Sequence, residues 1–96
     1  MPRLAIVRGE PSELSQAEWD QAFPEFFWPA YPRKIGRYEA QKSWSRLRPR
    51  TQETFDWILA GLEFHKNLWR EEQRAPNMVP HASTFLNQHR WEDVEK

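Results

Sequence analysis

The chain has 96 residues and a mass of 11.7 kDa, a size that predicts one small domain with a thin core. Hydrophobic residues make up 39% of the sequence and charged residues 29%, which is too apolar for a disordered tail and too polar for a membrane protein. The absence of Cys excludes disulfides and thiolate metal sites, and it fits a reducing compartment. Six Trp, six Phe and two Tyr indicate either a core built from bulky side chains or rings exposed for a partner.

The net charge is zero, but the charges are unevenly distributed along the chain. Residues 31–50 carry a local charge of +6, whereas residues 1–30 and residues 51–96 each carry −3. The basic residues of the central segment are Arg33, Lys34, Arg37, Lys42, Arg46, Arg48 and Arg50. A neutral total argues against a histone-like binder, while the local excess permits an anion-binding face.

We expect a flexible N-terminal segment over residues 1–13, a helical module over residues 14–93 and a tail over residues 94–96. A capping-box pattern at Ser15 and Glu18 predicts the start of the first helix, which extends to about Trp28. Pro24 interrupts this helical period, so we expect either a break there or a second helix with Pro24 in its first turn.

A second helix is predicted from Gly36 to about Leu47, with Trp44 on its apolar stripe and Pro49 closing it. Thr51 is a good N-cap for the longest helix, roughly residues 52–74. Gly61 inside that helix predicts a close crossing with another element, because Gly is otherwise unfavourable there.

The longest helix has two apolar faces, the second of which is formed by Trp57, Phe64 and Leu68. A short last helix is predicted from Ala82 to about His89, with Ser83 or Thr84 as its cap and Phe85 and Leu86 docking inward. These patterns predict an all-α fold, a small irregular bundle of three main helices plus a short C-terminal helix.

The sequence does not predict catalysis, a cofactor or a metal. The three His residues, His65, His81 and His89, do not fall at a metal-binding spacing, and Ser83 near His81 is better explained as a helix cap than as a nucleophile.

Aromatic and basic residues alternate between residues 28 and 50, a mixture suited to single-stranded nucleic acid, because bases stack on rings while cations follow the phosphates. The predicted nucleic-acid-binding residues are Tyr31, Arg33, Lys34, Arg37, Tyr38, Lys42 and Arg46. In the alternative interpretation Trp28 and Trp44 belong to the core and the cations only solubilise an outer face.

Two strings carry a resemblance to a known family. Residues 26–47, FFWPAYPRKIGRYEAQKSWSRL, resemble a block near the C-terminus of many bacteriophage and prophage replication proteins, the O-like proteins or replisome organisers. Residues 79–93, VPHASTFLNQHRWED, are similar to the second block of that region, with Phe85 where Trp is more usual. The chain also looks distantly like the single-strand-binding region of the primosomal protein DnaT.

The resemblance implies a small helical module that acts in origin preparation or helicase loading, in the cytoplasm of a bacterial host. Members of that family usually carry an N-terminal winged-helix domain that this sequence lacks, which leaves open a shortened protein or a free-standing module. The partners predicted are single-stranded DNA and a replicative helicase or another replisome protein, with no membrane and an open oligomeric state. A protein-interaction adaptor and a phage-encoded inhibitor of a host protein remain alternatives.

Charge placement distinguishes these hypotheses. A DNA module requires the cations Arg33, Lys34, Arg37, Lys42 and Arg46 on one open face, with the second apolar face of the long helix buried. A protein adaptor instead predicts cations that are scattered or paired with acids, and an exposed second apolar face with Trp57, Phe64 and Leu68.

Overall fold

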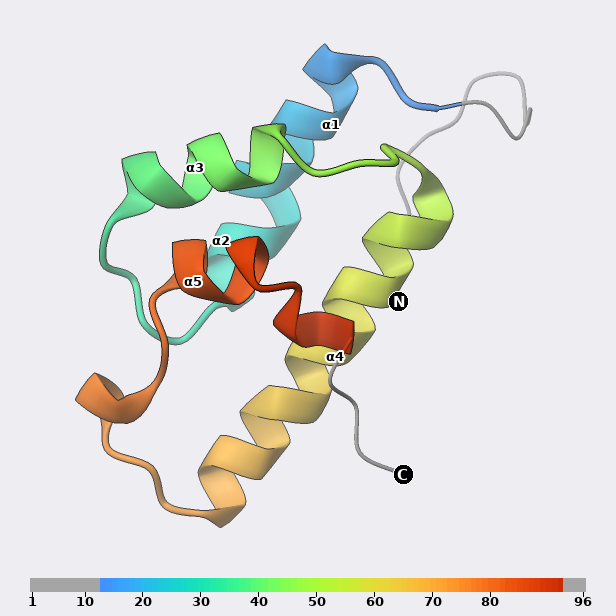
Figure 1. The fold of residues 1–96 in the computed structure, drawn as a ribbon. Helices are drawn as coiled ribbons and strands as arrows, with labels where there is room; N and C mark the ends of the chain where they lie inside the picture. Colours follow the sequence, from blue (N-terminus) through green and yellow to red (C-terminus); the bar gives the residue numbers. More distant parts are fainter. Residues whose placement is uncertain (1–12, 93–96) are drawn as a thin grey trace.

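The computed structural model describes residues 13–92, and all of its regular elements are helical (Figure 1). The predicted tail and all but the last residue of the predicted N-terminal segment lie outside the described residues. The elements are α1 (Gln16–Ala22), a π-helical turn η1 (Phe23–Phe27), α2 (Trp28–Ala30), α3 (Arg37–Ser45), α4 (Gln52–Glu71), η2 (Pro76–Met78), α5 (Ala82–Asn87) and η3 (Arg90–Glu92). The predicted all-α class is confirmed.

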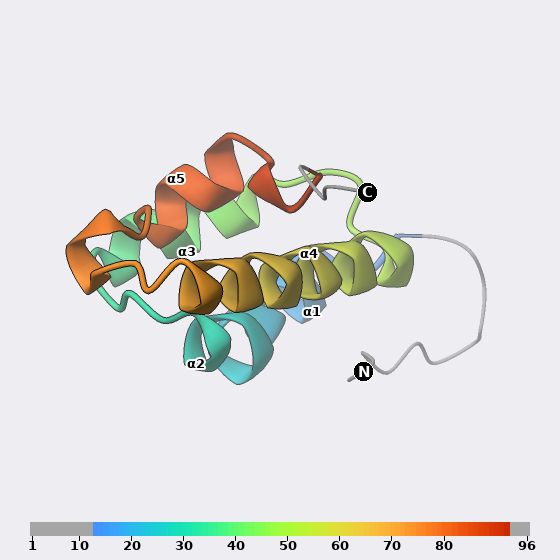
Figure 2. The same ribbon diagram turned by 90° about the horizontal axis from the view of Figure 1, so that it is seen from below.

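The long helix α4 runs along one side of the molecule in the view of Figure 1. In Figure 2, α5 lies on one side of α4 and α2 on the other. Both α1 and α5 pack against α3, and η3 packs back onto α4. This arrangement closes a core from segments that are far apart in the sequence.

The first helix begins as its sequence predicts but passes through Pro24 without a break. Ser15 and Glu18 form the complete capping box at the start of α1. Pro24 lies in the first turn of the π-helical segment η1, which runs directly into α2. The wider turn, in which the Trp28 N–H donates to the Phe23 carbonyl, accommodates a residue that has no N–H of its own.

The two central helices follow their predicted caps but end earlier than expected. Gly36 precedes α3 with a φ of 72°, a left-handed conformation that favours glycine. The Thr51 hydroxyl accepts a hydrogen bond from the Thr54 N–H at 3.1 Å, which confirms Thr51 as the cap of α4. The last helical residue of α4 is Glu71, because the backbone turns at Gln73, which has a φ of 55°.

Most of the large rings form the core. Fully buried aromatic side chains are Trp19, Phe23, Phe27, Tyr31, Trp44, Phe55 and Phe85. Among the rings of residues 28–50, Trp44 is therefore a core residue, and Trp28 is half-buried with its ring 5.6 Å from that of Phe23. Tyr38 and Trp57 are the exposed rings of the described chain, at 71% and 50%.

The predicted close crossing at Gly61 is confirmed. A Cβ atom at this position would lie only 2.6 Å from the Trp91 Cα, because η3 rests directly on the backbone of α4. Trp91 is 2% exposed and closes the core at this end.

The predicted cap of the last helix is wrong. His81 holds the N-cap position of α5 and makes no capping hydrogen bond through its side chain. Ser83 and Thr84 lie inside the first turn, because the helix begins one residue before Ser83. Phe85 and Leu86 are fully buried, as their positions predicted.

Candidate nucleic-acid interface

The outer face of α3 presents a ring and cations to solvent. Ala40, Ser43 and Trp44 are buried on the inner side, so the 100° step of a helix places Tyr38, Lys42 and the C-cap residue Arg46 on the opposite side. The Lys42 Nζ lies 4.8 Å from the centre of the Tyr38 ring, within the range of a cation–π contact. We call Tyr38, Lys42 and Arg46, together with Arg37 in the first turn, the α3 face; all four are exposed, and the 100° step places Arg37 at the edge of this face.

The positive charge of the α3 face is only partly compensated. Lys42 pairs with Glu39 at 3.8 Å, and the two side chains are 44% and 64% exposed. Exposed pairs of this kind contribute little energy and exchange easily with other partners. Arg37 and Arg46 form no ion pair or hydrogen bond through their side chains with the described residues. These cations are therefore available to an anion.

Tyr31 is not part of any exposed face, which corrects the prediction that it contacts nucleic acid. Its side chain is fully buried, its ring stacks 5.5 Å from that of Phe27, and its hydroxyl donates to the Pro80 carbonyl at 2.6 Å. Burial raises the pKa of Tyr31 well above its usual range, although the nearby guanidinium groups of Arg90 and Arg33 act in the opposite direction. A base has no access to this ring.

Arg33 and Lys34 hold the loop between α2 and α3 in place. Arg33 donates to the carbonyls of Val79 at 2.8 Å and Asn77 at 3.2 Å, which fastens the loop to the segment around η2. The Lys34 ammonium donates to the Pro29 carbonyl at 3.1 Å and to the Tyr31 carbonyl. Both cations thus satisfy backbone oxygens within the fold rather than standing free on the α3 face.

Two further cations of the basic segment have the same structural use. Arg48 donates to the Leu47 carbonyl at 2.7 Å, and Arg50 donates to the Leu14 carbonyl at 3.0 Å. Much of the local charge of +6 therefore stabilises loop backbone. A DNA module was expected to have five cations on one face, but the structure divides them. The α3 face carries Arg37, Lys42 and Arg46, whereas Arg33 and Lys34 lie in the loop before it.

The second apolar face of α4 is also divided. Trp57 is 50% exposed, whereas Phe64 and Leu68 are half-buried. The structure meets neither the full condition for a DNA module nor the full condition for a protein adaptor.

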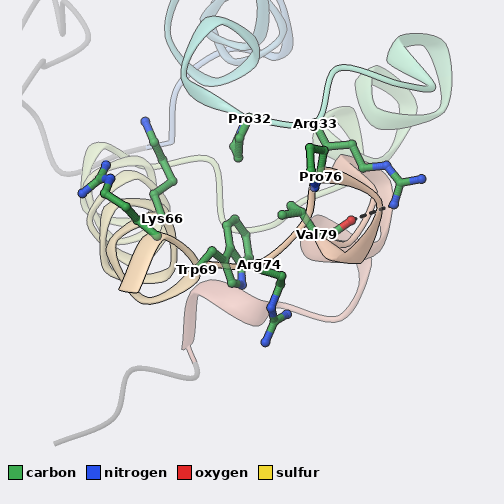
Figure 3. A pocket seen from close by; sticks show the side chains of 8 residues that line it. Pro32, Arg33, Lys66, Trp69, Arg74, Pro76 and Val79 are labelled. Carbon is green, nitrogen blue, oxygen red and sulfur yellow. Dashed lines mark hydrogen bonds between the residues drawn. The ribbon is translucent and has the colours of Figure 1, made fainter. Parts of the chain in front are cut away.

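Sequence reasoning missed a second group of cations, which surrounds a pocket of about 280 Å³ (Figure 3). Lys66, Arg70 and Arg74 come from the end of α4 and the turn after it, and Arg33 joins them from the loop. The three residues recur every fourth position, a like-charge spacing that costs an isolated helix about 0.2–0.5 kcal/mol per pair. This spacing was a signal for the site in the sequence. It was missed because residues 51–96 carry a net charge of −3.

The described residues offer no sign of a metal centre or a membrane span. They contain no cluster of three or more His, Asp or Glu side chains placed to hold a metal ion. Among the helices of residues 13–92, none has the length and apolarity that crossing a membrane requires.

Fold and surface together define a small all-α module with an exposed basic helix face and a separate basic pocket. Residues 14–89 match the family model described as the Legionella vir region protein LvrA C-terminal domain. Because the match spans most of the chain, the protein belongs to this family. No curated protein and no solved structure matched the chain. The family description does not mention DNA replication, so the resemblance to phage replication proteins stays a prediction.

Proposed function

We propose that this chain is a single-strand DNA-binding module of phage-type replication and that the α3 face is its contact surface. The observation that carries the proposal is the 71% exposure of Tyr38 beside Lys42 on a helix whose other face is buried. Burying large rings is the rule in this chain, so a Tyr that remains outside, next to cations, suits a ligand with a flat apolar face.

The proposed contact uses two kinds of interaction. A base stacks on the Tyr38 ring, which contributes about 1–3 kcal/mol for each stacked base and is tolerant of sequence. Arg37, Lys42 and Arg46 neutralise phosphates along the strand and release counterions. Glu39 is exchanged for a phosphate as the partner of Lys42, because their ion pair is exposed to solvent.

The test is fluorescence anisotropy of a labelled single-stranded oligonucleotide at several salt concentrations. Tyr38→Ala should weaken binding about 5- to 150-fold, the equivalent of one lost stacked base. Replacing Arg37, Lys42 and Arg46 together by Ala should lower the salt slope by about 2, since each phosphate contact on a single strand contributes about 0.7.

The matched control is Arg70→Ala, which removes an exposed cation outside the α3 face and should leave oligonucleotide binding unchanged. Arg33 and Lys34 are unsuitable for this test, because their loss would also release the loop that they fasten. Equal affinities for the wild type and both α3-face variants at low salt would remove the proposal.

The exposure of Trp57 favours a second candidate, an adaptor that contacts a replicative helicase or another replisome protein. Trp57 borders a hollow of about 470 Å³ at the start of α4, lined also by Pro49 and Thr54. Exposed Trp residues are frequent anchors of protein interfaces. In a pull-down with purified helicase, Trp57→Ala should abolish capture and Tyr38→Ala should retain it. The opposite pattern, or no capture by the wild type, would reject the adaptor.

A further inference from the structure

The basic pocket is built from three segments that are distant in the sequence. The loop after α2 supplies Pro32, the second half of α4 supplies Trp69, and the stretch around η2 supplies Pro76 and Val79 (Figure 3). These four apolar residues form the lining between the cations. The pocket has a volume of about 280 Å³, which is sufficient for one apolar side chain.

Three of the four cations can turn to a ligand. Lys66 pairs with Glu63 at 3.3 Å, Arg74 with Glu72 at 2.7 Å, and Arg70 donates to the Asn67 side chain at 2.7 Å. These side-chain partners lie two or three residues away at the surface, where ion pairs exchange readily. Arg74 also donates to the Met78 carbonyl, but over a long distance of 3.4 Å. No acidic residue of the described chain lines the pocket itself.

The fourth cation has a fixed role. The Arg33 guanidinium is turned toward the Val79 carbonyl, away from Trp69 (Figure 3). It holds η2 against the loop and so keeps the pocket wall in place.

The pocket floor does not suit a stacked base. Trp69 and Val79 are each only 6% exposed. The Trp69 ring is surrounded by His65 at 5.7 Å, Tyr31 at 6.2 Å and Phe85 at 6.4 Å between ring centres. The accessible part of the pocket is a small apolar surface between Pro32 and Pro76. It can accept an inserted side chain, but it exposes no ring face on which a base could stack.

We infer that this pocket binds an acidic peptide segment of a partner protein, with one apolar side chain of the peptide inserted against Trp69 and Val79. Carboxylates of the peptide pair with Lys66, Arg70 and Arg74 around the opening. Arg forms bidentate pairs with carboxylates, and an apolar anchor between charged contacts is a common way for a short peptide to gain specificity. Charge complementarity thus selects the occupant, and the site is separate from the α3 face.

The experiment measures binding of a fluorescein-labelled decapeptide of Asp and Gly residues with a single Phe, by anisotropy at physiological ionic strength. The wild-type chain should bind it, and Arg70→Glu should weaken binding by at least about tenfold, because a charge-assisted hydrogen bond is worth about that factor. Lys66→Glu independently tests the group of cations around the pocket opening. Arg70 is exposed and the Lys66 side chain is 24% exposed, and circular dichroism should show that both variants keep the wild-type fold.

Two controls are needed. The first distinguishes the contribution of the apolar anchor from that of the charges, and the second distinguishes this pocket from the α3 face. A peptide with Ala in place of Phe should bind at least about fivefold more weakly, because the apolar pocket stays empty. The Lys42→Ala variant removes a cation of the α3 face and should bind the original peptide like the wild type.

Three outcomes would overturn the inference. The first is no peptide binding by the wild type, and the second is equal binding by the wild type and Arg70→Glu. The third is that the wild type binds the oligonucleotide but not the peptide, and that Arg70→Glu loses oligonucleotide binding. This result would assign the pocket to nucleic acid. Loss of oligonucleotide binding only in the α3-face variants leaves this inference intact, so the two proposals fail separately.

Discussion

Trp19 and Trp44 exchange hydrogen bonds through their indole N–H groups. The Trp19 Nε1 donates to the Trp44 carbonyl at 2.8 Å, and the Trp44 Nε1 donates to the Trp19 carbonyl at 2.6 Å. Their rings stack with centres 4.8 Å apart and planes 17° apart. This reciprocal pair joins α1 to α3, and by fixing which side of α3 faces inward it also sets which side carries Tyr38 outward.

The reciprocal pair should be indispensable for folding. Trp44→Ala removes a fully buried ring and one hydrogen bond, so the free energy of unfolding should fall by about 3–5 kcal/mol, a large part of the stability of so small a domain. Tyr38→Ala is the matched control on the same helix and should change stability by no more than about 0.5 kcal/mol. Urea denaturation followed by circular dichroism measures both. A well-folded Trp44→Ala protein would contradict the proposed phase of α3.

Gly61 should not tolerate even a methyl group. Alanine favours helix by about 1 kcal/mol relative to glycine, but here its Cβ would meet the backbone of Trp91. Overpacking should outweigh the propensity, so Gly61→Ala should lower the free energy of unfolding by about 1–3 kcal/mol. The exposed neighbour Ala60 provides the control, since Ala60→Gly reports the propensity alone. A stabilised Gly61→Ala protein would show that η3 does not rest on α4.

Gln73 is a site where glycine should stabilise the chain. Its φ of 55° ends α4 with two backbone bonds, from the Gln73 N–H to the Arg70 carbonyl and from the Arg74 N–H to the Trp69 carbonyl, the pattern in which glycine is usual. Gln73→Gly should raise the free energy of unfolding by about 0.5–1 kcal/mol, after the greater flexibility of glycine in the unfolded chain is included. Gln73→Ala should give no such gain in thermal unfolding experiments.

Tyr31 should make stability depend on alkaline pH. Because burial raises its pKa, the folded protein keeps the phenol proton at pH values where the unfolded chain loses it, above about 10. The contribution of this group is therefore complete below about pH 10 and declines as the pH rises beyond it. Tyr31→Phe should be less stable than the wild type by about 1 kcal/mol at pH 8, through the lost hydrogen bond to Pro80.

The measurement compares denaturant unfolding of the wild type and Tyr31→Phe at pH 8 and pH 11. The difference between the two proteins should shrink or reverse at the higher pH, since the phenylalanine variant has no proton to lose. A constant difference across this range would mean that Tyr31 is exposed to solvent in solution.

Local chemistry was sufficient to predict the helices and their starts. The capping box at Ser15, the Thr51 cap and the apolar spacing around Trp44 act over three or four residues, so the sequence by itself determined the all-α class and the inward side of α3. Gly61 predicted a close crossing because glycine is unfavourable inside a helix unless another element packs against it. The sequence could not show that this element contains Trp91.

Only the tertiary structure determined which groups the charged side chains contact. Arg33 looks like a phosphate ligand in the sequence, yet it holds carbonyls that come from more than 40 positions away. Tyr31 is buried by contacts with Phe85 and Pro80, which are equally remote. Lys66, Arg70 and Arg74 form a basic pocket because the chain returns at η2 to place Pro76 and Val79 beside them. Residue type determines what a side chain can bind, but long-range packing determines whether that capacity is used inside the fold or left at its surface.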